Sequence, residues 1–311
     1  MRAVVFAYHT VGVRCLSVLL DAGVDIALVL THQDAPGENI WFDSVIALCE
    51  RHGLSWITPD DPNTADVMQR IAGCQPDILF SFYYRQMLKA PILALAPQGA
   101  MNMHGSLLPR YRGRVPVNWA IIHGERETGA TLHYMTEKPD AGAIIEQATV
   151  PILGDDTAIE VFHKVVCAAE IALHRAMPAI LAGTVQSRPQ DLAQGSYFSG
   201  RRPEHGEIDW NQSAQSIHNL IRAVAPPYPG AFTQLAGKSL RILRSKIRPD
   251  MTGVHAKPTF FCDNRACYAQ CGDGVILQLL ELEWDNRCLS AAEWSTVTGG
   301  QPVPLLQPLS S

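Results

Sequence analysis

Residues 100–114 read AMNMHGSLLPRYRGR, and the interpretation of the whole chain starts from them. The apolar beginning predicts a short strand, in which alternate side chains share a face, so Asn102 and His104 point the same way. An amide and an imidazole at the end of a strand can polarise a carbonyl group and transfer a proton. Three arginines, at 110, 112 and 114, suit an anionic ligand. A buried strand end followed by a solvated basic loop is the plainer alternative, but these features together favour a site of chemistry.

The chain before this segment predicts an α/β fold. Val4–Ala7 and Asp25–Leu30 are apolar runs of strand length, and the helical pattern of Thr10–Ala22 connects them. With a further apolar strand at Asp77–Phe82, the pattern indicates a Rossmann-like, doubly wound, mostly parallel sheet. The turn after the first strand lacks the three glycines of a dinucleotide-binding loop, so NAD is not indicated. The pair Tyr8-His9 follows this strand, where such folds bind ligands, and a structural role is an equal alternative.

Composition breaks divide the chain into two expected domains, 1–185 and 204–311, joined by a polar, proline-marked linker at 186–203. The first domain ends with a long helix, which begins at the capping box Thr157 to Glu160. In the second domain, short strands punctuated by glycines predict a small β-barrel or open sheet.

The composition is that of a globular protein, with 47% hydrophobic and 18% charged residues among 311. A net charge of −5 argues against a general nucleic-acid partner. No apolar run was found that approaches a membrane span or a signal peptide, so we expect no membrane partner and a cytoplasmic location. The eight cysteines include no Cys-x-x-Cys and are expected to be reduced, buried thiols. Cys262, Cys267 and Cys271 lack paired metal-site spacing, so no metal is expected.

The central segment resembles a known family. Asn102, His104 and the run 106–109 (SLLP), followed by Gly113, are similar to the signature of the formyltransferases that use 10-formyltetrahydrofolate. The family has an aspartate in an Asp-x-Gly setting further along the chain, and residues 140–142 (DAG) occupy that place. The resemblance weakens after about Phe232. It implies an N-formyltransferase with 10-formyltetrahydrofolate as co-substrate and an OB-like C-terminal domain.

The resemblance also implies roles for individual residues. Asn102 would stabilise an oxyanion, His104 would act as general acid, and Asp140 would favour the protonated imidazole. The residues expected to bind the folate are Gln86, Met87, Leu88, Thr136, Glu137, Lys138, Pro139 and Asp140. Those expected to contact the acceptor are Tyr111, Arg114 and Asn118.

Within the family, residues 111–119 (YRGRVPVNW) look most like the enzymes that formylate UDP-4-amino-4-deoxy-L-arabinose in lipid A modification and polymyxin resistance. In that pathway a decarboxylase is often fused to the transferase, so a separate decarboxylase partner is an open expectation here, as is a homo-oligomer. Three alternatives remain: a methionyl-tRNA formyltransferase, an N-formyltransferase of another nucleotide-linked amino sugar, and a non-catalytic folate sensor. The acidic chain disfavours the tRNA enzyme, and three intact catalytic residues disfavour the sensor.

Overall fold

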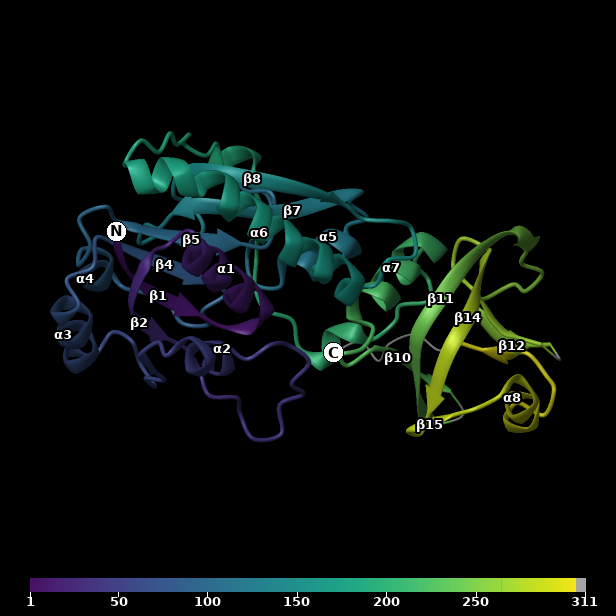
Figure 1. Cartoon of the computed structure of the whole chain (residues 1–311). Helices are drawn as coiled ribbons and strands as arrows, with labels where there is room; N and C mark the ends of the chain where they lie inside the picture. Colours follow the sequence, from purple (N-terminus) through teal and green to yellow (C-terminus); the bar gives the residue numbers. More distant parts are fainter. Residues whose placement is uncertain (236, 264, 306–311) are drawn as a thin grey trace. The chain divides into compact units, whose positions relative to one another are not determined.

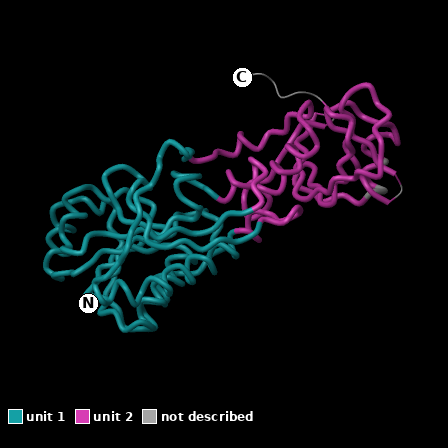
Figure 2. The backbone as a smooth tube through the Cα atoms, turned by 90° about the horizontal axis from the view of Figure 1, so that it is seen from above, with its two compact units in different colours: residues 1–116, 127–151, 162–199 teal, residues 117–126, 152–161, 200–311 magenta. Residues whose placement is uncertain are grey.

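The computed structural model describes residues 1–235, 237–263 and 265–305, which belong to two compact units (Figures 1 and 2). Unit 1 consists of residues 1–116, 127–151 and 162–199, and unit 2 of residues 117–126, 152–161 and 200–311. The expected linker, 186–203, is divided between them, with 186–199 in unit 1 and 200–203 in unit 2. The last residues of the expected second domain, 306–311, lie outside the described residues.

Unit 1 is built on a seven-stranded sheet in the order β3-β2-β1-β4-β5-β7-β8 (Figure 1). The strands are β1 (Arg2–Ala7), β2 (Asp25–Leu30), β3 (Trp56–Ile57), β4 (Ile78–Phe82), β5 (Ala100–His104), β7 (Glu127–Tyr134) and β8 (Ile144–Pro151). Strands β1 to β5 are mutually parallel, whereas β7 and β8 continue the sheet in antiparallel pairs. The prediction of a Rossmann-like, mostly parallel sheet is confirmed.

The helices of unit 1 bury one face each. They are α1 (His9–Asp21), α2 (Val45–His52), α3 (Ala65–Gly73), α4 (Ala90–Leu93) and most of α6 (Ala158–Ala182). In α1 the buried residues include Val11, Cys15, Leu16 and Leu19, a spacing that places them on one side of a helix. Two short strands, β6 (Arg112–Gly113) and β9 (Tyr197–Phe198), form a parallel pair that the sequence did not suggest, and a 3₁₀ turn (Leu192–Gln194) precedes β9.

Helix α6 contradicts the expectation that no apolar segment approaches the length of a membrane span. Its 25 residues include a window of mean hydropathy 1.5, so by length and composition alone it could cross a membrane. Half of that window is buried in the protein. Val165, Ala169 and Leu173 lie on the buried face, whereas His163 and His174 are exposed. The helix therefore packs as the amphipathic core helix of unit 1, and its polar residues are spaced so that none interrupts the apolar face.

In its described residues, unit 2 combines three helices with an antiparallel sheet. Its helices are α5 (Pro116–Ile122, from Val117 on), α7 (Ala214–Val224) and the short α8 (Ala291–Val297), and a 3₁₀ turn spans Pro203–Gly206. The strands are β10 (Ala231–Leu235), β11 (Lys238–Thr252), β12 (Thr259–Cys262), β13 (Cys267–Gln270), β14 (Val275–Trp284), β15 (Arg287–Cys288) and β16 (Val303–Pro304). They follow the order β10-β11-β14-β13-β12-β16, with β15 paired to β14. The prediction of a β-rich C-terminal domain is confirmed.

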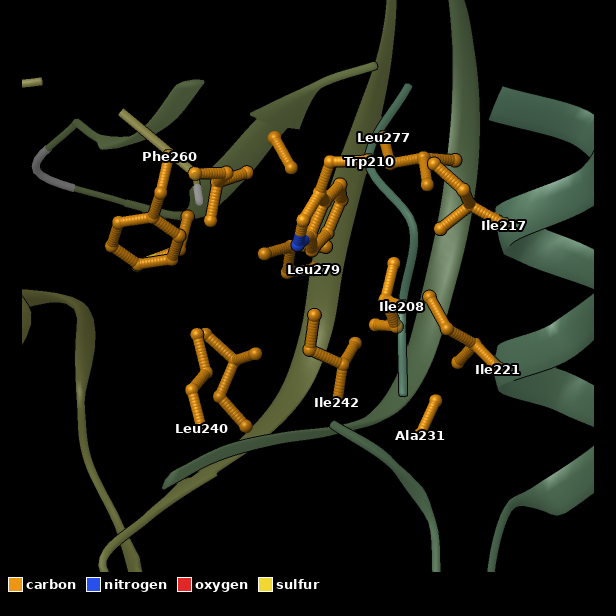
Figure 3. Packing of buried hydrophobic residues seen from close by; sticks show 14 of the residues in the cluster. Ile208, Trp210, Ile217, Ile221, Ala231, Leu240, Ile242, Phe260, Leu277 and Leu279 are labelled. Carbon is orange, nitrogen blue, oxygen red and sulfur yellow. The ribbon is translucent and has the colours of Figure 1, made fainter. Parts of the chain in front are cut away.

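The core of unit 2 lies between α7 and the sheet (Figure 3). Ile217 and Ile221 of α7 are one helical turn apart and point toward the strands. Trp210 is 1% exposed and donates a hydrogen bond from its Nε1 to Thr233 Oγ1 at 3.1 Å. This hydrogen bond satisfies the polar N–H of the buried ring.

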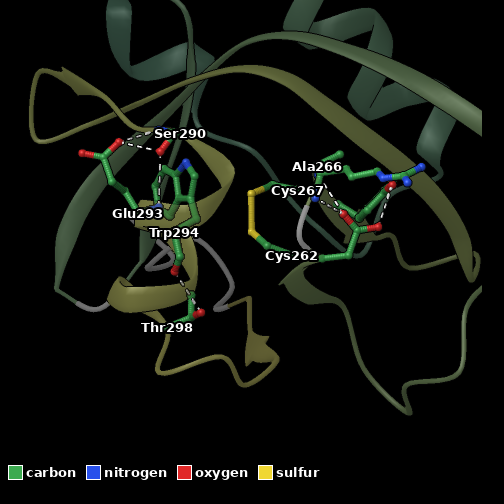
Figure 4. Close-up of a disulfide and its surroundings, with 10 residues drawn as sticks. Cys262, Ala266, Cys267, Ser290, Glu293, Trp294 and Thr298 are labelled. Carbon is green, nitrogen blue, oxygen red and sulfur yellow. Dashed lines mark hydrogen bonds between the residues drawn. A yellow bond between two sulfur atoms is a disulfide. The ribbon is translucent and has the colours of Figure 1, made fainter.

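One pair of cysteines departs from the expectation of reduced thiols. Cys262 and Cys267 are register partners in the hairpin of β12 and β13, and a disulfide joins them (Figure 4). Their spacing in the sequence gives no such signal, because the hairpin register brings them together. Cys271 is a buried free thiol as expected, but Cys167 and Cys288 are exposed.

Candidate active site

Strand pairing in unit 1 brings three polar side chains onto one face of the sheet. Asn102 on β5 is the register partner of His133 on β7, and its Nδ2 lies 3.1 Å from His133 Nε2. His104 follows Asn102 by two residues and therefore points to the same face. His104 is 7% exposed and His133 is 2% exposed, so the cluster is largely shielded from water.

The loop between β7 and β8 folds back toward this cluster and places Asp140 beside both imidazoles. Asp140 Oδ1 lies 3.6 Å from His104 Nδ1 and 3.7 Å from His133 Nε2. Its Oδ2 accepts a hydrogen bond from the backbone N–H of Gly113 at 2.9 Å. The side chain of Gln190 donates to the backbone oxygen of Asp140 at 3.0 Å and holds the loop in place. The structure thus brings the three residues expected to be catalytic into one cluster.

The backbone around the cluster is strained. Tyr83, Tyr111, Val115 and Asp140 have φ values of 58°, 57°, 48° and 51°, in the left-handed region. Such a conformation is uncommon for residues other than glycine, and most unfavourable for a β-branched residue such as Val115. Strained residues persist only where the surrounding structure holds them, and they concentrate at functional sites.

Burial keeps the ring of His133 neutral, and its hydrogen bonds determine which ring nitrogen carries the proton. Burial lowers the pKa of His133 to about 4, although the nearby Asp140 carboxylate acts in the opposite direction. The ring is therefore neutral at pH 7. Its Nδ1 lies 2.8 Å from the carbonyl oxygen of Tyr134, which only accepts, so Nδ1 carries the proton. Nε2 then accepts from Asn102 Nδ2 and orients that amide, whose second N–H can serve a substrate oxygen.

The imidazole of His104 is held between a carbonyl group and a carboxylate. Its Nε2 donates to the backbone oxygen of Tyr111 at 2.8 Å, which leaves Nδ1 facing Asp140. Within the described parts of the chain, no group of three or more His, Cys, Asp or Glu residues is arranged to hold a metal ion. The cluster instead offers an oriented N–H donor and a proton donor, which suits oxyanion stabilisation with proton transfer.

The residues expected to bind the folate lie on the segments that follow β4 and β7. Gln86, Met87 and Leu88 follow β4, the neighbour of β5 on one side. Leu88 is buried, and Met87 is 53% exposed. Thr136, Glu137, Lys138, Pro139 and Asp140 follow β7, the neighbour on the other side. Thr136 to Lys138 are exposed, and the Thr136 hydroxyl donates to the backbone oxygen of Lys138 at 3.0 Å.

The three residues expected to contact the acceptor differ in their surroundings. Arg114 is exposed. Tyr111 is 8% exposed, and its ring stacks on Phe198 with centroids 5.5 Å apart. Asn118 belongs to unit 2, where its buried side chain donates to the backbone oxygen of Ala223 at 2.7 Å. Among the three, Arg114 has the side chain that a ligand can most readily reach.

Sequence reasoning did not single out His133 or Gln190. No motif indicates His133, and its position opposite Asn102 depends on an antiparallel register that the sequence does not give. Gln190 lies in the segment expected to be a linker. Arg112 was noted in the basic run, but it is only 8% exposed, and its Nε has no hydrogen-bond partner among the described residues.

Several solved structures share the fold of this chain. The N-formyltransferase from Helicobacter canadensis, in complex with folinic acid and dTDP-3-aminofucose, is 20% identical, with a TM-score of 0.68 over 89% of this chain and 98% of that chain. WlaRD, a sugar 3N-formyl transferase solved in the presence of dTDP and 5-N-formyl-THF, is 20% identical, with a TM-score of 0.70 over 92% and 98%. A sugar N-formyltransferase from Shewanella sp FDAARGOS_354 is 19% identical, with a TM-score of 0.63 over 78% and 96%.

Family models match both parts of the sequence. Residues 2–177 match the model described as formyl transferase, and residues 201–297 match the model of the formyl transferase C-terminal domain. The first match covers the strands that carry Asn102, His104 and His133, as well as the loop of Asp140. Together the two matches span most of the chain, and the protein therefore belongs to the formyl transferase family.

Proposed function

We propose that this protein transfers the formyl group of 10-formyltetrahydrofolate to the 4-amino group of UDP-4-amino-4-deoxy-L-arabinose. The observation that carries the proposal is the shielded cluster of Asn102, His104 and Asp140 on β5 and the β7–β8 loop. Two structures of similar fold were solved with a formylated folate, and one of these also held a dTDP-linked amino sugar. These likenesses support a folate donor and a sugar-nucleotide acceptor.

The residues of the cluster supply what formyl transfer requires. When an amine attacks the formyl carbon, negative charge develops on the formyl oxygen, and the N–H of Asn102 can stabilise it. The departing folate nitrogen needs a proton, which a protonated His104 can donate. The carboxylate of Asp140 stabilises that imidazolium and can accept the proton that the attacking amine releases, directly or through water. His133 takes no proton in this scheme, because its role is to orient the amide of Asn102.

The remaining expected residues are assigned to the two substrates. The segments Gln86 to Leu88 and Thr136 to Asp140 would bind the folate, and Asp140 places the second of them at the cluster. Arg114 is exposed and cationic, which suits the diphosphate of a nucleotide sugar. Tyr111 is buried and stacked on Phe198, so we assign it the shaping of the acceptor site rather than a charged contact. Asn118 is already engaged by its hydrogen bond to Ala223 in unit 2, so we assign it a structural role there.

A specific observation favours one alternative acceptor. Because one structure of similar fold contains dTDP-3-aminofucose, another nucleotide-linked amino sugar is the second candidate. Methionyl-tRNA is less favoured, since the chain carries a net charge of −5 and a polyanion is bound best by a basic surface. We further propose a cytoplasmic location, a role in lipid A modification and antibiotic resistance, and supply of the sugar by a separate decarboxylase.

The test is a transfer assay with 10-formyltetrahydrofolate and three acceptors: UDP-4-amino-4-deoxy-L-arabinose, a dTDP-linked 3-amino sugar and methionyl-tRNA. Product is measured by mass spectrometry of the acceptor and by the release of tetrahydrofolate. Formylation of the UDP sugar with the highest kcat/KM supports the proposal. A higher kcat/KM for the dTDP-linked sugar would change the acceptor that we assign but not the reaction. Turnover of the tRNA alone would contradict an amino-sugar function.

A further inference from the structure

Tyr83 stands beside the catalytic strand but has no role in the scheme above. It follows β4 directly, and the parallel register that pairs Phe82 with Met103 puts Tyr83 next to His104. A Cβ at Gly105 would lie 2.0 Å from the Tyr83 hydroxyl oxygen, so residue 105 must be glycine for the phenol to occupy this position. Tyr83 also has a left-handed backbone, with φ of 58°. The fold therefore accepts strain to bring this hydroxyl to the end of β5.

The other face of Tyr83 belongs to an aromatic cluster at the end of β1. The Tyr83 ring lies 6.2 Å from that of His9 and 6.1 Å from that of Phe162. His9 stacks on Phe42 at 4.0 Å, and the edge of Trp41 approaches it at 4.7 Å. Among the described residues, His9 Nδ1 is a buried polar atom with no hydrogen-bond partner. A polar atom in this state is costly unless a ligand or water satisfies it.

The strand order places this cluster where α/β sheets bind ligands. In the order β3-β2-β1-β4-β5, the chain builds outward in one direction from β1 and in the other from β4. A crevice forms at such a switch point, outside the carboxyl ends of the two central strands. His9 follows β1 and Tyr83 follows β4, so the two residues lie at that point. Tyr83 lies beside Gly105 at the end of β5, whereas the loop that follows it turns toward the segment after β3, where Asn63 Nδ2 donates to the backbone oxygen of Met87 at 3.0 Å. The fold therefore separates Tyr83 from Met87 along the edge of the sheet, which leaves Tyr83 for the second substrate.

We propose that Tyr83 binds the acceptor, with its hydroxyl hydrogen-bonded to a sugar hydroxyl group and the aromatic cluster of His9, Trp41, Phe42 and Phe162 packed against the sugar ring. This inference rests on the proposed function, because it assumes a sugar acceptor. The Tyr83 hydroxyl lies against Gly105, one residue after His104, so a sugar held there would lie beside the residue that we assign to proton transfer. Tyr83 selects and positions the acceptor and takes no part in proton transfer.

The test compares Tyr83→Phe with the wild-type protein. This variant keeps the ring and removes only the oxygen, so the KM for the amino sugar should rise about two- to twelvefold, the range of a single hydrogen bond. The Kd of 5-formyltetrahydrofolate, measured by fluorescence titration, should not change. Tyr268→Phe is the matched control, because it removes a phenolic hydrogen bond to Asp263 in unit 2, and it should leave both values unchanged.

A second pair of variants tests the contact with Gly105. Gly105→Ala should lower the melting temperature and raise the acceptor KM, because its methyl group meets the phenolic oxygen. Adding Tyr83→Phe removes that oxygen, so the double variant should recover part of the lost melting temperature.

An unchanged acceptor KM in Tyr83→Phe would overturn the inference, as would a weaker folate Kd with the acceptor KM unaffected. Failure of the proposed function looks different, since the wild-type protein itself would then formylate no amino sugar. The KM of Tyr83→Phe and of the wild type is then compared with the acceptor that the wild type does formylate. If that acceptor has no sugar hydroxyl group and its KM still rises in Tyr83→Phe, the inference is also overturned.

Discussion

The contact between His133 and Asn102 yields a quantitative prediction. His133→Phe removes the Nε2 acceptor that orients the Asn102 amide over a distance of 3.1 Å. One neutral hydrogen bond contributes about 0.5–1.5 kcal/mol, and 1.4 kcal/mol corresponds to a tenfold change in rate. We therefore expect kcat to fall by roughly two- to twelvefold. Asn102→Ala removes the oxyanion donor itself, and such a loss lowers kcat by about 100- to 1,000-fold.

The two substitutions should not be additive. Once Asn102 is alanine, His133 has no amide to orient, so adding His133→Phe should lower kcat little further. His133→Gln is the matched control, because its side-chain oxygen can still accept a hydrogen bond and should retain more activity than phenylalanine. The assay is steady-state turnover of formyl transfer at saturating folate. Full additivity in the double variant, or a loss in His133→Phe as large as in Asn102→Ala, would refute the orienting role.

Three further predictions concern the loop and the buried histidine. Asp140→Asn keeps an acceptor for the Gly113 N–H but removes the charge beside His104, so kcat should fall by about 100-fold or more while the folate Kd, from fluorescence titration, changes little. In Gly142→Ala, the new Cβ would lie 1.8 Å from the backbone oxygen of Tyr134, so urea unfolding should show a loss of about 1–3 kcal/mol. The pKa of His133 is about 4 in the folded protein and near 6.5 in the unfolded chain. As the pH falls from 6.5 toward 4, the unfolded chain therefore takes up a proton that the folded protein does not, and the free energy of unfolding falls. The free energy of unfolding should drop by up to about 3 kcal/mol more in the wild type than in His133→Gln over this interval, and equal slopes would contradict the burial argument.

The sequence predicted the parts of this protein that local patterns determine. The limits of β2, Asp25–Leu30, agree with the expected strand, because an apolar run follows Asp25 and ends at the polar Thr31. Half of the capping box at Thr157 forms as expected, since the Thr157 N–H donates to Glu160 Oε2 at 2.6 Å, and the Thr157 hydroxyl group donates to the same oxygen at 2.7 Å. Asn102 and His104 could be placed on one face because that depends only on the alternation of side chains in a strand.

The features that were missed depend on contacts between distant segments. His133 joins the cluster through the antiparallel register of β5 and β7, and the Cys262–Cys267 disulfide depends on the register of a hairpin. Gln190 reaches the Asp140 loop from a polar segment that resembles a linker, because the sequence alone does not show that residues 186–199 pack on unit 1. Registers and long-range packing are set by the whole fold, and no local pattern encodes them.

Replacement of His104 by alanine is the most direct test of the account, which holds that the cluster on β5 performs formyl transfer. The variant and the wild-type protein are compared in two measurements, the Kd of 5-formyltetrahydrofolate and the turnover of 10-formyltetrahydrofolate with the preferred acceptor. We predict that His104→Ala still binds the folate and loses turnover by about 100-fold or more, because the proton donor is gone. Wild-type turnover in this variant would contradict the assignment of chemistry to the cluster.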